Sequence, residues 1–160
     1  MSRDILIYSE HDQPVALQNM LAGMRARQVP LEWNPDTFAE RFQKPGPAGW
    51  VAGTLAPQSS RDPADEVTLS HKELSNRARR RLLDAYGDAL TSDQRERLAR
   101  ARRSYRISVG WSPRSERERL LVSLVDVLAE AAAGLIHDLQ DDRFYDREQY
   151  VALHDRPGDQ

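Results

Sequence analysis

The sequence predicts an α+β fold, in which a mixed, mainly antiparallel sheet of about five to six strands carries helices mostly on one face. Short apolar runs with a period of two alternate with longer segments in which apolar residues recur at helical spacing. Strand–helix–strand units occur at both ends of the chain, and successive strands lie between them. A sheet with helices mainly on one face is the economical way to bury such elements.

The composition limits the class of protein. The length of 160 residues fits one domain, expected over residues 1–150, with a flexible tail over 151–160. The absence of cysteine excludes disulfides, thiolate metal sites and thiol nucleophiles. No apolar run is long enough for a signal peptide or a membrane span, so we expect a cytoplasmic protein without a membrane partner. The net charge of −2 makes nucleic acid an unfavoured partner, and the dominance of arginine over lysine is typical of a GC-rich bacterial genome.

Residues 104–145 form the unit around which the chain is organised. Tyr105, Ile107, Val109 and Trp111 alternate with polar residues, which predicts a strand with one buried face. Ser112-Pro113 fits a helix start. The helix that follows has an apolar stripe, and a second strand, a turn and a short return complete the unit over 135–145. The stripe consists of Leu120, Leu121, Leu124, Val127, Leu128, Ala131 and Ala132, and Gly134 is expected to end the helix.

The first third of the chain predicts a strand, a helix and another strand. The apolar run 5–8 is expected to be a central strand, followed by a helix over 13–28 that Asp12 caps, with Pro14 in its first turn. The strand over 29–33 should lie near an edge of the sheet, because Pro30 has no backbone N–H to donate. A short helix over 36–43 would hold Phe38 and Phe42.

The middle of the chain predicts two strands followed by two helices. Strands are expected over 50–55 and 66–70, and Gly53 within the first indicates a bulge or a close backbone approach. One helix runs from residue 72 to the stop at Gly87. Thr91 and Gln94 fit a capping box that begins the next helix, which should end near residue 103.

Two polar segments are candidate chemical sites. Glu10, His11 and Asp12 follow the first strand and could bind a metal or relay a proton, but we favour a helix-capping loop, which already explains these polar residues. The segment 137–142 offers a histidine and three carboxylates for Mg²⁺ or Ca²⁺, but it lacks the glycine and final glutamate of an EF-hand loop. A hairpin turn also needs such aspartates, and we favour this second interpretation.

Arginines crowd the two middle helices, where they could face an anionic partner or RNA. Acidic residues interleave with them, which favours a solvated surface with internal ion pairs. The cluster comprises Arg77, Arg79, Arg80, Arg81, Arg95, Arg97, Arg100, Arg102 and Arg103. His71 has no nucleophile motif to complete a triad, and no P-loop, HExxH or GxGxxG occurs. We therefore predict no catalytic residue, no metal and no cofactor.

Residues 134–150, with the sequence GLIHDLQDDRFYDREQY after a helix ending LAEAAAG, resemble the C-terminal strand and turn of small bacterial α+β proteins. Some of those proteins look like immunity or accessory partners of secreted toxins. The resemblance is structural, and it carries no functional residue over to this chain. It implies a binding protein.

Three functional hypotheses follow. The first is a non-enzymatic protein that binds another protein, plausibly as an immunity or regulatory protein that neutralises a toxin. Its partner-binding residues would be Asp138, Asp141, Asp142, Phe144 and Tyr145, in which acidic groups capture a basic surface and aromatics anchor it. The second is a small enzyme or ligand-binding domain with a pocket at the end of strand one, formed by Glu10, His11 and His71. The third is a nucleic-acid accessory protein that uses the arginine-rich helices.

Overall fold

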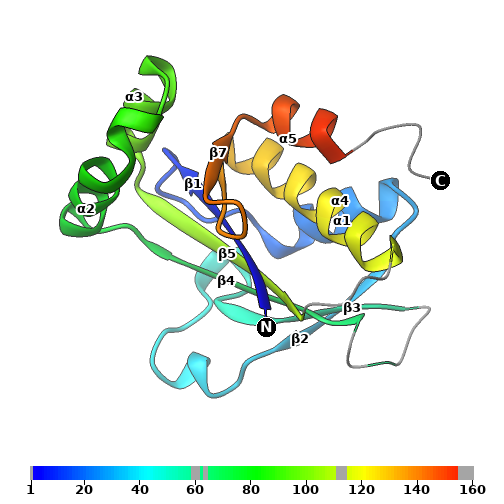
Figure 1. The fold of residues 1–160 in the computed structure, drawn as a ribbon. Helices are drawn as coiled ribbons and strands as arrows, with labels where there is room; N and C mark the ends of the chain where they lie inside the picture. Colours follow the sequence, from blue (N-terminus) through cyan, green and yellow to red (C-terminus); the bar gives the residue numbers. More distant parts are fainter. Residues whose placement is uncertain (1, 59–61, 63–64, 111–114, 155–160) are drawn as a thin grey trace.

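A computed structural model describes residues 2–58, 62, 65–110 and 115–154, and it has the predicted α+β architecture (Figure 1). Seven strands form one sheet in the order β2-β3-β4-β5-β1-β6-β7. The strands are β1 Ser2–Ser9, β2 Leu31–Pro35, β3 Ala52–Pro57, β4 Val67–Glu73, β5 Arg103–Gly110, β6 Leu135–Asp138 and β7 Arg143–Tyr145. The helices are α1 Leu17–Ala26, α2 Asn76–Tyr86, α3 Ser92–Arg100, α4 Ser115–Ala132 and α5 Arg147–His154. Short 3-10 turns are η1 Ala39–Arg41, η2 Gly46–Ala48 and η4 Gly87–Ala89.

Every pairing of neighbouring strands is antiparallel, so the sheet is not mixed, and the short β7 brings its strand number above the prediction. The strand β1 is central, as predicted, because it pairs with β5 on one side and β6 on the other. The edge position predicted from Pro30 is also confirmed, since β2 ends the sheet. The opposite edge is β7, and the two edges therefore lie a full sheet width apart.

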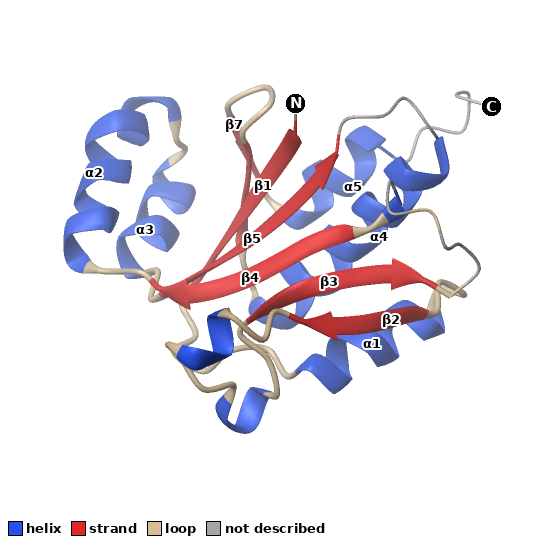
Figure 2. Ribbon diagram, turned by 90° about the horizontal axis from the view of Figure 1, so that it is seen from below, coloured by secondary structure: helices blue, strands red, loops and turns tan. Residues whose placement is uncertain are grey.

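Three helices cover one face of the sheet. In Figure 2 the strands β2 to β5 lie in front, with α1, α4 and α5 behind them. The core on this side contains Ile5, Ile7, Trp50, Tyr105 and Met20, all with no exposed surface. The hairpin of α2 and α3 packs on the other face at the end of β1 and β6, around a smaller cluster formed by Tyr8, Leu90, Leu98, Ala101 and Leu135.

The helix α4 binds the sheet through the predicted apolar stripe. Leu124 and Leu128 are fully buried, in one cluster with Ile107, Val109 and Ile136. Of the stripe, only Ala131 is exposed. The predicted start at Ser112-Pro113, and Trp111 before it, lie outside the described residues.

The helix α4 ends close to Gly134, as expected, but the physical role of Gly134 differs from the prediction. Ala133, not Gly134, takes the left-handed backbone conformation, with a φ of 48°. Gly134 is needed for close approach instead, because a Cβ there would lie 2.3 Å from Ile7 Cγ2. A similar close approach explains Gly53, whose Cβ would lie 2.4 Å from the carbonyl oxygen of Asn34.

The helix boundaries test two predicted caps. The capping box of Thr91 and Gln94 is confirmed, with both reciprocal hydrogen bonds formed. The cap at Asp12 is wrong, since α1 begins after Ala16 without any side-chain cap. The described chain also stays helical past the predicted domain end at residue 150, because α5 continues to His154.

Candidate functional site

The β6–β7 hairpin contains the residues predicted to bind a partner. Its connecting turn, Leu139, Gln140, Asp141 and Asp142, is exposed along its whole length. Asp142 has a φ of 56°, a left-handed conformation that aspartate tolerates better than most residues. The tip of the hairpin therefore presents two carboxylates and one leucine to solvent.

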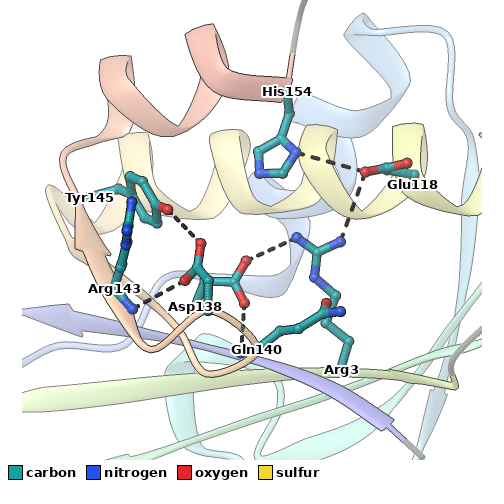
Figure 3. Close-up of polar contacts among 8 residues, drawn as sticks. Arg3, Glu118, Asp138, Gln140, Arg143, Tyr145 and His154 are labelled. Atoms are coloured by element: carbon teal, nitrogen blue, oxygen red, sulfur yellow. Dashed lines mark hydrogen bonds and ion pairs between the residues drawn. The ribbon is translucent and has the colours of Figure 1, made fainter. Parts of the chain in front are cut away.

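Asp138 lies inside the protein, where it is paired with Arg3 (Figure 3). Arg3 Nη2 donates to Asp138 Oδ2 at 2.9 Å, and the backbone N–H of Gln140 donates to Asp138 Oδ1 at 3.0 Å. Burial acts to lower the pKa of the Arg3 guanidinium, but the hydrogen bond to Asp138, together with the electrostatic effects of Tyr150, Asp138 and Glu118, raises that pKa. The pair ties the hairpin to β1, and a partner protein would not reach Asp138 while the pair is closed.

Asp141 organises the other side of the turn. The Tyr145 hydroxyl donates to Asp141 Oδ2 at 2.5 Å, and the Arg143 backbone N–H donates to Asp141 Oδ1 at 3.1 Å. Desolvation, followed by the hydrogen bond to Asp141, raises the pKa of Tyr145 to about 12. Tyr145 is half-buried, so its ring is partly available to a partner.

Asp142 joins the turn to an aromatic cluster. His137 Nε2 lies 3.0 Å from Asp142 Oδ1, and the buried imidazole stacks on Phe144 at 4.1 Å. The Tyr86 ring of α2 meets the same imidazole edge to face at 4.9 Å. Hydrogen bonds from His137 and then from Tyr86 lower the pKa of Asp142. Phe144 thus anchors the hairpin to the α2–α3 side of the molecule.

The hairpin therefore has a fixed shape and an acidic tip. Among the described residues, no three histidine, aspartate or glutamate side chains are placed to hold a metal ion together. The carboxylates of Asp141 and Asp142 are exposed, and they accept hydrogen bonds from within the chain. Such an arrangement suits binding of a basic surface.

A second polar cluster joins α5 to the start of β1 and α4. Glu118 Oε1 lies 3.9 Å from Arg3 Nη1 and 3.8 Å from His154 Nδ1 (Figure 3). The buried Tyr150 hydroxyl and Arg3 Nε have no hydrogen-bond partner within the described part of the chain. Burial, and then the charge of Arg3, lower the pKa of His154. These contacts hold the last helix against the sheet.

The residues predicted to form a pocket at the end of strand one lie on either side of β5. The end of β1 at Ser9 and the end of β4 at Glu73 both pair with Arg103, the first residue of β5. His71 is buried and faces inward, with Nε2 at 2.8 Å from the Trp50 carbonyl oxygen and Nδ1 at 2.9 Å from Arg103 Nη1. Glu10 and His11 are exposed. Asp12 contributes a backbone contact: its carbonyl oxygen accepts a hydrogen bond from Arg103 Nε at 2.9 Å.

The arginine-rich segment divides into two groups. On α3, Arg97 pairs with Asp146 at 2.8 Å and Arg100 with Glu96 at 3.3 Å, while Arg95 donates to the carbonyl oxygen of Gly87. This group matches the expectation of internal pairing. The arginines of α2 are Arg77, Arg79, Arg80 and Arg81, and none of them forms an ion pair with a described residue.

The sequence reasoning missed a pair of exposed aromatics at the η1 turn. Phe38 is 64% exposed and Phe42 is 79% exposed, and their rings meet edge to face at 5.3 Å. Two of the three phenylalanines of the chain therefore lie side by side on the surface. One sign of this exposure was present in the sequence: both phenylalanines lie in a short polar segment, which ends at Lys44-Pro-Gly-Pro47.

A cleft of about 370 Å³ lies between α3, the end of α4 and the start of α5. Arg97 and Asp146 pair across it, and Arg147 Nη2 lies 3.4 Å from Glu130 Oε2. Its charged groups are largely satisfied by one another, and nothing in the cleft selects a particular ligand.

None of the helices in the described ranges combines the length and apolar character that a bilayer-spanning segment requires. Comparisons with protein-family models, curated proteins and solved structures give no match.

Proposed function

We propose that the protein is a non-enzymatic binding protein whose partner is another protein, held at the Phe38–Phe42 surface. This surface is defined as the two phenylalanine rings and the loop 36–43 that presents them. The observation that carries the proposal is the exposure of both rings in mutual contact. Isolated exposed apolar residues are common on protein surfaces, whereas adjacent aromatics are typical of interface anchors.

The loop does not need the two rings for its own fold. Asp36 Oδ1 accepts hydrogen bonds from the backbone N–H groups of Phe38 and Ala39 at 3.0 and 3.2 Å. The backbone N–H of Gln43 closes the turn on the carbonyl oxygen of Ala39 at 3.1 Å. A loop fixed in this way loses little conformational entropy when a partner covers it.

The acidic hairpin tip is the alternative contact surface. The Phe38–Phe42 surface follows the end of β2, the strand at one edge of the sheet, and the hairpin forms the other edge. Six strand spacings of about 4.8 Å separate the two edges, or about 29 Å. A small partner would therefore engage one surface first. The rings of Phe38 and Phe42 offer apolar area to bury, whereas Asp141 and Asp142 mainly offer electrostatic attraction.

The proposed biological role is neutralisation of a toxin or a similar regulatory contact, as the C-terminal resemblance implies. In such a role binding alone blocks the partner, and this proposal assigns no catalytic step to the chain. Two points support this role. The loop 36–43 is already ordered and presents aromatic anchors, so it loses little conformational entropy on binding, and residues 134–150 have the resemblance described above.

Affinity purification with two matched variants tests the proposal. Tagged wild-type protein, Phe38→Ser/Phe42→Ser and Asp141→Asn/Asp142→Asn are expressed in cells of the source organism. We expect one stoichiometric protein with the wild type and with the aspartate variant, and its loss with the phenylalanine variant. A toxin role further requires that co-expression restores growth to cells producing that partner. Retention of the partner by the phenylalanine variant would overturn the proposal.

A further inference from the structure

The helix α2 carries a local concentration of positive charge. Arg77, Arg80 and Arg81 are exposed and have no ion pair with any described residue. We call these three residues the α2 arginine face. The remaining arginine, Arg79, turns inward and donates to the carbonyl oxygen of Ala101 at 2.5 Å. Asp84 is the only acidic residue of the helix.

The spacing of these arginines lowers the stability of the helix. Arg77 stands three and four residues before Arg80 and Arg81, so the three guanidinium groups lie on neighbouring positions of one helical surface. Like charges at this spacing repel one another. The first turn also has no acidic residue, and cations near the positive end of the helix dipole are unfavourable. An external anion would relieve both effects.

More cations lie at the base of α2. Lys72 is exposed near the end of β4, and Arg102 is exposed before β5, where its carbonyl oxygen accepts from the Leu74 backbone N–H at 2.9 Å. Thr68 and Ser70 alternate with buried residues along β4 and so point to the face opposite α1 and α4. Figure 2 shows this side of β3, β4 and β5 without a helix over it.

The chemistry of this region distinguishes two kinds of anionic partner. A protein interface has an apolar centre, but the exposed large apolar residues of the described chain, Phe38, Phe42, Leu139 and Leu153, all lie outside α2, β4 and β5. Arginine, lysine, serine and threonine side chains are the groups that contact phosphates and sugars in nucleic-acid complexes. The region therefore fits a phosphate backbone better than an acidic protein surface.

We propose that the α2 arginine face binds the phosphate backbone of a nucleic acid without reading its sequence. This inference goes beyond the proposed protein-binding function and uses a different surface. The net charge of −2 describes the whole chain, and it conceals a local excess on one helix. Sequence-independent binding follows because the one aromatic ring of α2, Tyr86, is half-buried against His137 and Phe144, and the contacts available are electrostatic.

Fluorescence anisotropy with defined probes tests this inference. The probes are a fluorescein-labelled single-stranded oligonucleotide of about 20 nucleotides and the matching duplex, titrated between about 50 and 200 mM KCl. We expect binding at the lowest salt concentration. The variant Arg77→Gln/Arg80→Gln/Arg81→Gln should reduce the affinity by about tenfold or more and the slope of log K against log salt by about two to three.

A matched variant removes the same charge elsewhere. Arg25, Arg119 and Arg143 are also exposed and unpaired within the described ranges, so their triple glutamine variant should keep most of the affinity and the salt slope. Equal losses in both triple variants would overturn the inference, because net charge alone would then control binding. Absence of binding at low salt would also overturn it. Competition by polyglutamate as effective as unlabelled oligonucleotide would instead identify an acidic protein as the occupant.

Discussion

The ring of Phe42 meets the ring of Phe38 edge to face at 5.3 Å, on a surface where neither ring is covered by the rest of the protein. Because both side chains are exposed, their removal should leave the fold almost unchanged. We expect Phe38→Ser/Phe42→Ser to alter the free energy of unfolding by less than about 0.5 kcal/mol per site. Urea unfolding monitored by circular dichroism checks this, and a large loss of stability would show that the rings support the loop.

Leu128 is fully buried between α4 and the sheet, with Ile107 and Ile136 in the same cluster. Leu128→Ala should leave a cavity and lower the free energy of unfolding by about 2–5 kcal/mol. The exposed Arg119 of the same helix provides the control, and Arg119→Ala should change it by no more than about 0.5 kcal/mol. Similar small effects of both changes in urea unfolding would contradict this packing.

The Arg3–Asp138 pair should matter more for stability than an exposed pair. Asp138→Ala leaves the partly buried Arg3 guanidinium without its carboxylate, and we expect a loss of about 3–5 kcal/mol. Glu96→Ala, which removes the exposed partner of Arg100, should cost at most about 1 kcal/mol. Thermal or urea unfolding of the two variants makes the comparison. Equal losses would mean that Asp138 does not anchor the hairpin.

Acid should weaken the fold through His71. Burial lowers the pKa of His71, and the nearby charge of Arg103 lowers it further, against the opposing hydrogen bond to Trp50. Above a pH of about 6.5 the imidazole is neutral in the folded and unfolded chains alike. Below it, the unfolded chain takes up a proton that the folded chain does not. The free energy of unfolding should therefore fall as the pH drops from about 6.5 toward the lower folded pKa.

The variant His71→Gln separates this contribution from that of His154, whose pKa is lowered too. Urea unfolding at a pH of about 7.5 and about 5.5 gives the decrease for each protein. We expect a smaller decrease for His71→Gln than for the wild type, with the remainder due partly to His154. An identical decrease would show that His71 does not contribute.

The fold was largely predictable because its signals are local. Alternating residues around Ile107 and the helical stripe around Leu124 each fix which face is buried, and the structure confirms both. The pairing of strands was less accessible, since β7 has three residues and the sheet order depends on contacts between distant segments. The cap at Asp12 failed because α1 begins only after Ala16, so Asp12 lies too far before the helix to cap it.

The candidate surfaces were harder to predict, for a physical reason. Sequence cannot show whether a phenylalanine such as Phe42 finds a covering neighbour, because burial depends on the tertiary arrangement. The same limit applied to charge: Asp138 is buried against Arg3, while Asp141 and Asp142 of the same segment are exposed. The free arginines of α2 and the paired arginines of α3 likewise look equivalent in sequence.

The most direct measurement is the affinity of the purified protein for the partner that it retains in affinity purification. Isothermal titration calorimetry compares the wild type with Phe38→Ser/Phe42→Ser and with Asp141→Asn/Asp142→Asn. A hot-spot residue at an interface contributes about 2 kcal/mol or more, so the loss of even one such contribution should make the phenylalanine variant bind at least about 30-fold more weakly. The aspartate variant should stay within about threefold of the wild type. An unchanged affinity of the phenylalanine variant would contradict the proposed role of the Phe38–Phe42 surface.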